Sequence, residues 1–220
     1  MLKVVVYDCG YGGEFFADRL AEELPIVEII RVIDWRHATE IQNSPRDARR
    51  FAKEALRPYI GKVDLIIFAN YLLAITSLKH FRRKYKTQRF TGLTLKKPCA
   101  KTRPNSLILT TKAVSRTISY YNFTRHFGDK PRTITLDSWP LLIDDGELTY
   151  DDIKLALFNY VDRASKSQDL FLLCSQFYDI KAELKRLFGH NVKIHDGFKD
   201  TIKDICRILK IRGGTLKKSR

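Results

Sequence analysis

Short apolar runs alternate along the chain with stretches of helical periodicity. Phe16, Leu20 and Leu24 recur at every fourth position, which places them on one face of a helix. A second helical pattern extends over residues 153–161. Runs rich in apolar and β-branched residues predict strands over residues 2–7, 27–33, 63–68, 106–110, 133–136, 170–173 and 192–194.

The second helical pattern has a clear start signal. Thr149, with Asp152 three positions later, is typical of a helix N-cap box. It follows Asp144, Asp145 and Gly146, which we interpret as a structural turn because Asp and Gly favour turn conformations.

Apolar strand runs separated by helices are typical of parallel strands that are covered on both faces, so the predicted fold class is α/β. The two halves of the chain repeat one plan, in which polar residues follow a strand. In open parallel sheets, ligands bind beyond the carboxyl ends of the strands. We therefore predict two similar lobes, each a parallel sheet flanked by helices, with the ligand cleft between them.

The lobes are assigned to consecutive parts of the chain. We predict a first lobe over residues 1–97 and a second over residues 98–190, with the boundary in the basic, proline-containing stretch 96–105. Residues 191–212 are expected to form a C-terminal strand and helix that pack back on the first lobe. Residues 213–220 form a basic tail.

Composition excludes several classes of protein. The chain has 220 residues, of which 44% are hydrophobic, so it can bury a sizeable core. Residues 65–79 are too short and too polar to span a bilayer, and the N-terminus lacks a signal-peptide pattern. We therefore expect no membrane association. The cysteines form no CxxC pair, which favours a reduced, cytoplasmic protein over a disulfide scaffold or zinc ribbon; they are Cys9, Cys99, Cys174 and Cys206.

Positive charge is concentrated in one part of the sequence. The chain has 40 Lys and Arg residues against 25 Asp and Glu residues, which gives a formal net charge of +15. Residues 65–128 contain no acid and carry 13 of the Lys and Arg residues. Such a block forms either a solvated face or a surface for nucleic acid or another polyanion.

The first predicted strand ends in D-C-G-Y-G-G over residues 8–13. Glycines here let the backbone approach a ligand, or they simply form a tight strand-to-helix turn. The segment is not a dinucleotide fingerprint, because the third glycine position holds Phe15.

With its order of motifs, the chain resembles the aspartate/glutamate racemases, and the glutamate racemases in particular. The family's D-S-G-x-G-G is matched over residues 8–13, its C-N-T by A-N-Y over residues 69–71, and its G-C-T-H-Y by L-C-S-Q-F over residues 173–177. Its I-D-S-G is matched by I-H-D-G over residues 194–197, and P-L-V-E-x-G loosely over residues 140–146. The resemblance implies a racemase-like fold, a small carboxylate or amino-acid ligand, and no cofactor. The histidines have no metal-ligand spacing, so we predict no metal.

Several departures from the family weaken the case for its activity. Cofactor-independent racemisation needs an acid–base group on each side of the substrate α-carbon, and in this family two thiols serve. The first thiol position holds Ala69, and the histidine beside the second thiol is replaced by Gln176. Tyr71 is bulky where the family has threonine, and Glu40, which falls in the family's P-Y-G segment, would repel a substrate carboxylate.

By resemblance, the remaining candidates fall into two groups. Cys174, Asp8 and Cys9 are the catalytic candidates, with Cys174 at a matched catalytic position and Cys9 as either a second acid–base group or a packing residue. The substrate-binding candidates are Asn70, Tyr71, Thr111, Ser175 and Gln176.

Three functions remain open at this stage. The first is a racemase-fold protein that binds a small carboxylate and either is a pseudoenzyme or does one-thiol proton chemistry with Cys174. The second is a binding module for nucleic acid or another polyanion on the same scaffold. The third is an active racemase or isomerase that uses Cys9 and Cys174. We also consider a homodimer.

Overall fold

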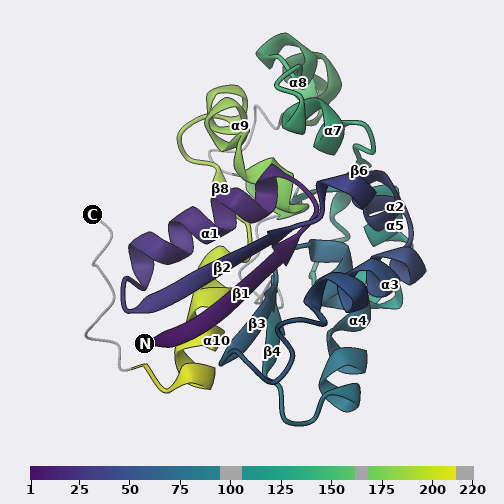
Figure 1. Ribbon diagram of the computed structural model, residues 1–220. Helices are drawn as coiled ribbons and strands as arrows, with labels where there is room; N and C mark the ends of the chain where they lie inside the picture. The colour runs from purple at the N-terminus through teal and green to yellow at the C-terminus, as the bar shows by residue number, and fades with distance from the viewer. Residues whose placement is uncertain (95–105, 162–167, 212–220) are drawn as a thin grey trace. The chain divides into compact units, whose positions relative to one another are not determined.

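The computed structural model describes residues 1–94, 106–161 and 168–211, and the chain divides into two compact units. The first unit comprises Met1–Leu95 and Gly197–Arg220, and the second comprises Lys96–Asp196. Each unit contains a four-stranded parallel sheet with flanking helices (Figure 1). The predicted α/β class with two similar lobes is confirmed. Within the described residues, no helix has the length and hydrophobicity needed to cross a membrane.

The first sheet has the strand order β2-β1-β3-β4. Its strands are β1 (Leu2–Asp8), β2 (Val27–Ile33), β3 (Leu65–Phe68) and β4 (Phe90–Gly92). The helices of this unit are α1 (Tyr11–Glu23), α2 (Ala38–Asn43), α3 (Pro45–Leu56), α4 (Tyr71–Lys84) and α10 (Phe198–Leu209), with a 3₁₀ turn at Trp35–His37.

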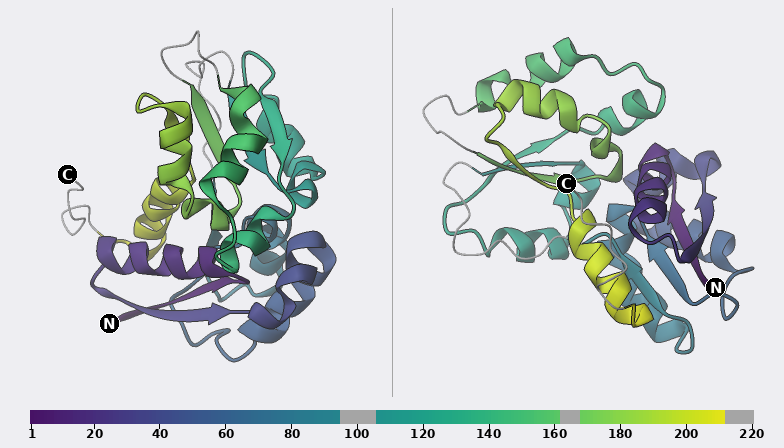
Figure 2. Two further views of the ribbon diagram at one scale, coloured as in Figure 1. Left: turned by 90° about the horizontal axis from the view of Figure 1, so that it is seen from above. Right: turned by 90° about the vertical axis from the view of Figure 1, so that its left-hand side faces the viewer.

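Alternation along the strands divides the first core into two faces. Val5 and Tyr7 of β1 and Phe68 of β3 pack in one cluster with buried residues of α3 and α4, so these helices cover one face of the sheet. Elsewhere in the unit, α1 and α10 meet through Phe16 and Phe198, whose ring centroids lie 5.2 Å apart. In Figure 2, α10 (yellow) runs beside strands of the first sheet.

The second sheet repeats the plan with the order β6-β5-β7-β8. Its strands are β5 (Leu107–Thr110), β6 (Arg132–Thr135), β7 (Asp169–Leu173) and β8 (Lys193–His195). The predicted capping box is present, because Thr149 and Asp152 exchange hydrogen bonds at the start of α8. The helices of this unit are α5 (Lys112–Ser115), α6 (Ile118–Thr124), α7 (Trp139–Asp144), α8 (Tyr150–Leu157) and α9 (Lys181–Phe188), with 3₁₀ turns at Phe158–Tyr160 and Ser175–Tyr178.

The C-terminal segment divides differently from the prediction. Its strand, β8, pairs with β7 and completes the second sheet, so it belongs to the second unit. Only α10 returns to the first unit, and the change of unit falls at Gly197, which has a left-handed φ of 76°. The predicted boundary at 96–105 and the tail at 213–220 lie outside the described residues.

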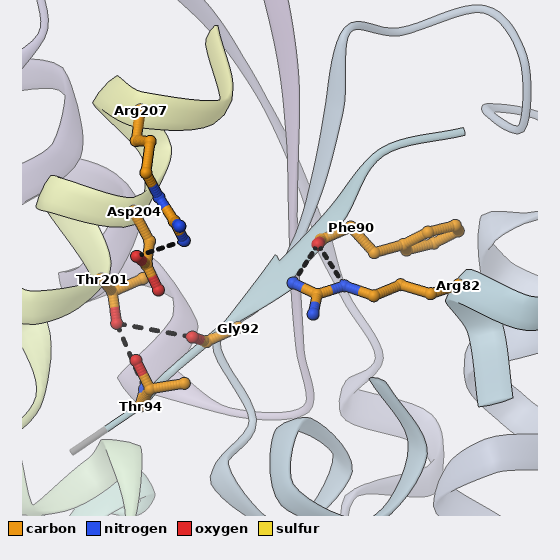
Figure 3. A network of polar contacts seen from close by, with 7 residues as sticks. All are labelled: Arg82, Phe90, Gly92, Thr94, Thr201, Asp204 and Arg207. Atoms are coloured by element: carbon orange, nitrogen blue, oxygen red, sulfur yellow. Dashed lines mark hydrogen bonds and ion pairs between the residues drawn. The ribbon is translucent and has the colours of Figure 1, made fainter. Parts of the chain in front are cut away.

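The edge strand β4 was not predicted, because three residues within a basic stretch carry too little apolar pattern. Side chains from both flanking helices hold it in place (Figure 3). Arg82 of α4 donates two hydrogen bonds to the carbonyl of Phe90, at 2.9 and 2.7 Å. Thr201 of α10 accepts from the backbone N–H of Thr94 at 3.2 Å, and its hydroxyl lies 2.9 Å from the carbonyl of Gly197 and 3.5 Å from that of Gly92.

The junction between β1 and α1 depends on close approach at Gly13. A Cβ atom at this position would lie 2.4 Å from the Cβ of Asp8 and 2.8 Å from the Cδ1 of Ile33. The glycine therefore lets α1 start directly against Asp8. This supports the tight-turn interpretation of the glycine segment.

We predict that Gly13→Ala destabilises the protein by about 1–3 kcal/mol, because the new methyl group overpacks the end of β1. A decrease in the free energy of unfolding would be informative, because replacing glycine by alanine within a helix normally increases stability. The matched control is Gly128→Ala, where a Cβ would meet nothing within 4 Å. Urea unfolding of both variants measures the difference, and equal stabilities would contradict the steric argument.

Candidate functional site

The carboxyl ends of β1 and β3 bring three predicted site residues together. Asn70 donates from Nδ2 to the Oδ1 of Asp8 at 3.2 Å and lies 3.4 Å from the Sγ of Cys9. Asp8 also accepts from the backbone N–H of Cys9 at 2.7 Å. All three side chains are buried. The predicted polar cluster at this edge of the first sheet is therefore present.

Asn70 is fixed in this cluster by a second role. Its Oδ1 accepts from the backbone N–H of Leu73 at 2.9 Å, which caps the start of α4. Because the oxygen is used for the cap, the amide nitrogen must face Asp8 and Cys9. The residue is both a structural cap and a donor of defined direction at the strand ends.

Neither sequence neighbour of Asn70 supplies a thiol. Ala69 is fully buried at the end of β3, and Tyr71 is a buried residue in the first turn of α4. Cys9 belongs to the hydrophobic cluster that includes Ile41 and Leu73. This burial supports the interpretation of Cys9 as a packing residue that stands in for serine.

Asp34 is a further polar residue near this edge that the motif analysis did not single out. Its backbone N–H donates to the carbonyl of Asp8 at 2.8 Å, and its Oδ1 lies 2.8 Å from the Nδ1 of His37. Burial raises the pKa of the Tyr7 hydroxyl, and the negative charge of Asp34 raises it further. Tyr7 therefore stays protonated. The position of Asp34 directly after β2 was the signal that could have identified it.

In the second unit, the end of β7 carries a cluster centred on Gln176. The Oε1 of Gln176 accepts from the Sγ of Cys174 at 3.0 Å and from the Oγ of Ser175 at 3.1 Å. Its Nε2 donates to the Oδ2 of Asp144 at 3.5 Å. Gln176 is almost fully buried, whereas Cys174 is half-buried.

This geometry limits the proton chemistry around Cys174. An amide oxygen can only accept the thiol proton in a hydrogen bond, because the amide does not take up a proton near neutral pH as an imidazole does. Asp144 is more than the turn residue that the sequence predicts. It is the last residue of α7, and its carboxylate accepts a hydrogen bond from Gln176. Gln176 thus connects the thiol of Cys174 to the carboxylate of Asp144 by hydrogen bonds, but it cannot transfer a proton between them.

Thr111 lies at the neighbouring strand end of the same sheet. Thr110 of β5 pairs with Leu173 of β7, so Thr111 and Cys174 are the residues that follow a register pair. Thr111 is buried and caps α5 by accepting from the backbone N–H of Val114 at 3.4 Å. Its hydroxyl oxygen therefore already accepts one hydrogen bond from the backbone.

No metal centre is found in the described part of the chain, where no group of three or more His, Cys, Asp or Glu side chains could hold an ion. His195, which ends β8, stacks on Phe171 and lies 3.1 Å from Asp169 through its Nε2. Asp169 begins β7, whereas Cys174 follows the end of that strand. His195 therefore has a partner away from the Cys174 cluster.

Comparison with known proteins confirms the predicted resemblance. No family model matches the chain. Its sequence is 26% identical over 213 residues to a glutamate racemase of Clostridium perfringens (strain 13 / Type A), covering 92% of this chain and 81% of that protein. The chain thus resembles the aspartate/glutamate racemases along nearly its whole length.

Solved structures agree on the fold. An Escherichia coli glutamate racemase in complex with L-glutamate and the activator UDP-MurNAc-ala has a TM-score of 0.80 at 17% identity, covering 100% of this chain and 86% of that chain. A glutamate racemase from Campylobacter jejuni subsp. jejuni has a TM-score of 0.77 at 18% identity, covering 100% and 89%. The shared fold is that of racemases.

We predict that Asn70→Ala costs about 2 kcal/mol, because it removes a helix cap and leaves Asp8 without this amide donor. Ser44→Ala is the control, since Ser44 caps α3 through the N–H of Asp47 and has no second role of this kind at the strand ends. That loss should be about 1 kcal/mol. Chemical denaturation of both variants tests the difference, and equal losses would mean that the Asp8 contact contributes nothing.

Proposed function

We propose that this aspartate/glutamate racemase-like protein binds a small carboxylate or amino acid at the carboxyl ends of its strands, and does not racemise it with two thiols. The observation that carries the proposal is Ala69 beside Asn70. The family pattern puts the first catalytic cysteine at the position of Ala69, while the asparagine that follows it is kept. The proposal is that Asn70 remains as a ligand contact, while the acid–base group for one face of the substrate is missing at Ala69.

The loss at Ala69 has a direct chemical consequence. Racemisation removes the α-proton on one face and returns a proton on the other, so each face needs its own acid–base group. A methyl side chain can neither accept nor donate a proton. The nearest thiol in the same unit, Cys9, is fully buried in a hydrophobic cluster and does not replace the missing group. The Cys9/Cys174 racemase is therefore the weaker alternative.

Cys174 supports one-thiol chemistry if activity remains. The thiol is half-buried and held by the amide of Gln176, which in turn is held by Asp144. A positioned thiol can return a proton to a carbanion on one face. This arrangement fits proton exchange with retention of configuration, or protonation after loss of carbon dioxide from a malonate.

The ligand class is supported by the polar groups that remain. Asp8, Asn70, Thr111 and Ser175 match family positions and lie at strand ends within their own units. Among structurally similar proteins, one glutamate racemase was solved with L-glutamate and another, from Francisella tularensis, with D-glutamate. Glu40 departs from this pattern and is exposed on α2, where its charge would repel a carboxylate placed beside it.

We predict that L- or D-glutamate, L- or D-aspartate or a malonate raises the melting temperature. A ligand at about 100 times its dissociation constant stabilises the native state by about 2.7 kcal/mol. Ser175→Ala should reduce the shift, because it removes a hydroxyl beside Cys174. Ser115→Ala is the matched control, because the hydroxyl of Ser115 donates to the carbonyl of Lys112 in its own helix. Absence of any shift across the panel would contradict carboxylate binding.

A second prediction concerns the chemistry. Proton NMR in D₂O should show either no loss of the α-proton signal or exchange without inversion that disappears in Cys174→Ala and persists in Cys9→Ala. The physical reason is that only one face retains a positioned thiol. Inversion of configuration that requires both cysteines would overturn the proposal and establish the two-thiol enzyme.

A further inference from the structure

The cations of the acid-free stretch 65–128 do not all belong to the same unit. In the described residues, its cations are divided between the two units, with Lys112, Arg116 and Arg125 in the second. Two of those in the first unit are used structurally, because Arg82 donates to the carbonyl of Phe90 and Arg89 to that of Ile208. The surface that concentrates positive charge must therefore be sought in the fold.

Such a surface is a pocket of about 340 Å³ between α3 and α4, which lie next to each other in Figure 1. Half of its lining comes from α3, outside the acid-free stretch. No acid is among the residues that line it, which are Arg46, Arg49, Arg50, Lys53, His80, Phe81, Lys84 and Tyr85.

Helix periodicity explains how these cations converge. Arg46, Arg49, Arg50 and Lys53 are spaced so that they share one side of α3, while Ala48 and Ala52 are buried. Like charges at this spacing destabilise a helix. Of the lining cations, Arg50 pairs with Asp47 at 3.1 Å. For the other Arg and Lys residues of the pocket, the described part of the chain offers no carboxylate within ion-pair distance.

Arg49 is already oriented within the pocket. Its Nε donates to the Oγ of the buried Ser77 at 3.2 Å, and its Nη2 donates to the carbonyl of Thr76 at 3.3 Å. Among the described residues, Nη1 has no hydrogen-bond partner and could donate to a ligand. A guanidinium held in this way loses little freedom on binding an anion, which favours affinity.

The floor of the pocket is aromatic. Phe81 is buried and Tyr85 is half-buried, with the Nζ of Lys84 5.3 Å from the centre of the Tyr85 ring. Desolvation lowers the pKa of His80, and the nearby charges of Arg49, Lys84, Arg83 and Lys53 lower it further. The pocket therefore carries a positive potential that a bound anion would relieve.

We infer that the pocket between α3 and α4 binds a ligand that carries two or more adjacent phosphate groups. A single carboxylate would neutralise only one of several converging cations, whereas a diphosphate or triphosphate matches their number and suits the planar arginine donors. The concave shape and volume are those of a small-molecule pocket, and the aromatic floor can accommodate a ring. This site is separate from the strand ends that carry the proposed carboxylate site.

Isothermal titration at physiological ionic strength with pyrophosphate, tripolyphosphate, ATP and a single-stranded oligonucleotide tests the inference. The pocket variant combines Arg46→Gln, Lys53→Gln and Lys84→Gln, all exposed side chains. The control removes equal charge outside the pocket by Arg57→Gln, Lys79→Gln and Lys86→Gln. We expect the pocket variant to weaken pyrophosphate binding by about 30-fold or more and the control by less than about 3-fold.

Two measurements distinguish phosphate binding in this pocket from non-specific electrostatic binding and from ligand binding at the proposed carboxylate site. Binding should raise the pKa of His80 in NMR titration, and the pocket variant should keep the wild-type response to glutamate. If ATP but not pyrophosphate loses affinity in Tyr85→Ala, the ligand is a nucleotide; if both are unaffected, the phosphates alone are recognised.

Several results would overturn the inference. They are absence of pyrophosphate binding, equal losses in both triple variants, an unchanged His80 titration, and an oligonucleotide that outcompetes ATP for the pocket. The last result would assign the surface to nucleic acid.

Discussion

The candidate site of the first unit depends on the parallel pairing of β1 with β3. Tyr7 lies opposite Phe68 in this register, so Asp8 and Cys9 leave the sheet at the same edge as Ala69 and Asn70. A shift by one residue would turn every side chain to the other face and separate Asp8 from Asn70. The hydrogen bond from Asn70 to Asp8 therefore requires this register, whereas the cap that Asn70 forms on α4 is local to its own helix.

The second unit uses the same constraint with different chemistry. Pairing of β5 with β7 places Thr111 and Cys174 at adjacent strand ends, and the turn after Cys174 returns Gln176 toward both the thiol and Asp144. The amide of Gln176 holds this hydrogen-bonded geometry without a group that exchanges protons near neutral pH.

Charge is distributed according to helix faces rather than sequence blocks. Arg82, inside the acid-free stretch, stabilises an edge strand, whereas Arg46 and Lys53, outside it, line the pocket between α3 and α4. The reason is geometric, because a helix brings together residues three or four positions apart and packing brings together two such helices. The net charge of a segment therefore says little about where its positive potential lies.

The sequence by itself determined the α/β class, the repeat of two parallel sheets and the racemase resemblance, since strand periodicity and motif order are local properties. It also placed Asp8, Asn70, Cys174 and Gln176 near the ends of predicted strands, where the structure has them. It missed β4, assigned β8 to the first lobe, and favoured a turn role for Asp144, whose carboxylate accepts from Gln176 in the structure. Only the tertiary structure decided these points, because edge pairing, the partner of a short strand and the convergence of side chains distant in sequence depend on packing between elements rather than on the pattern within one.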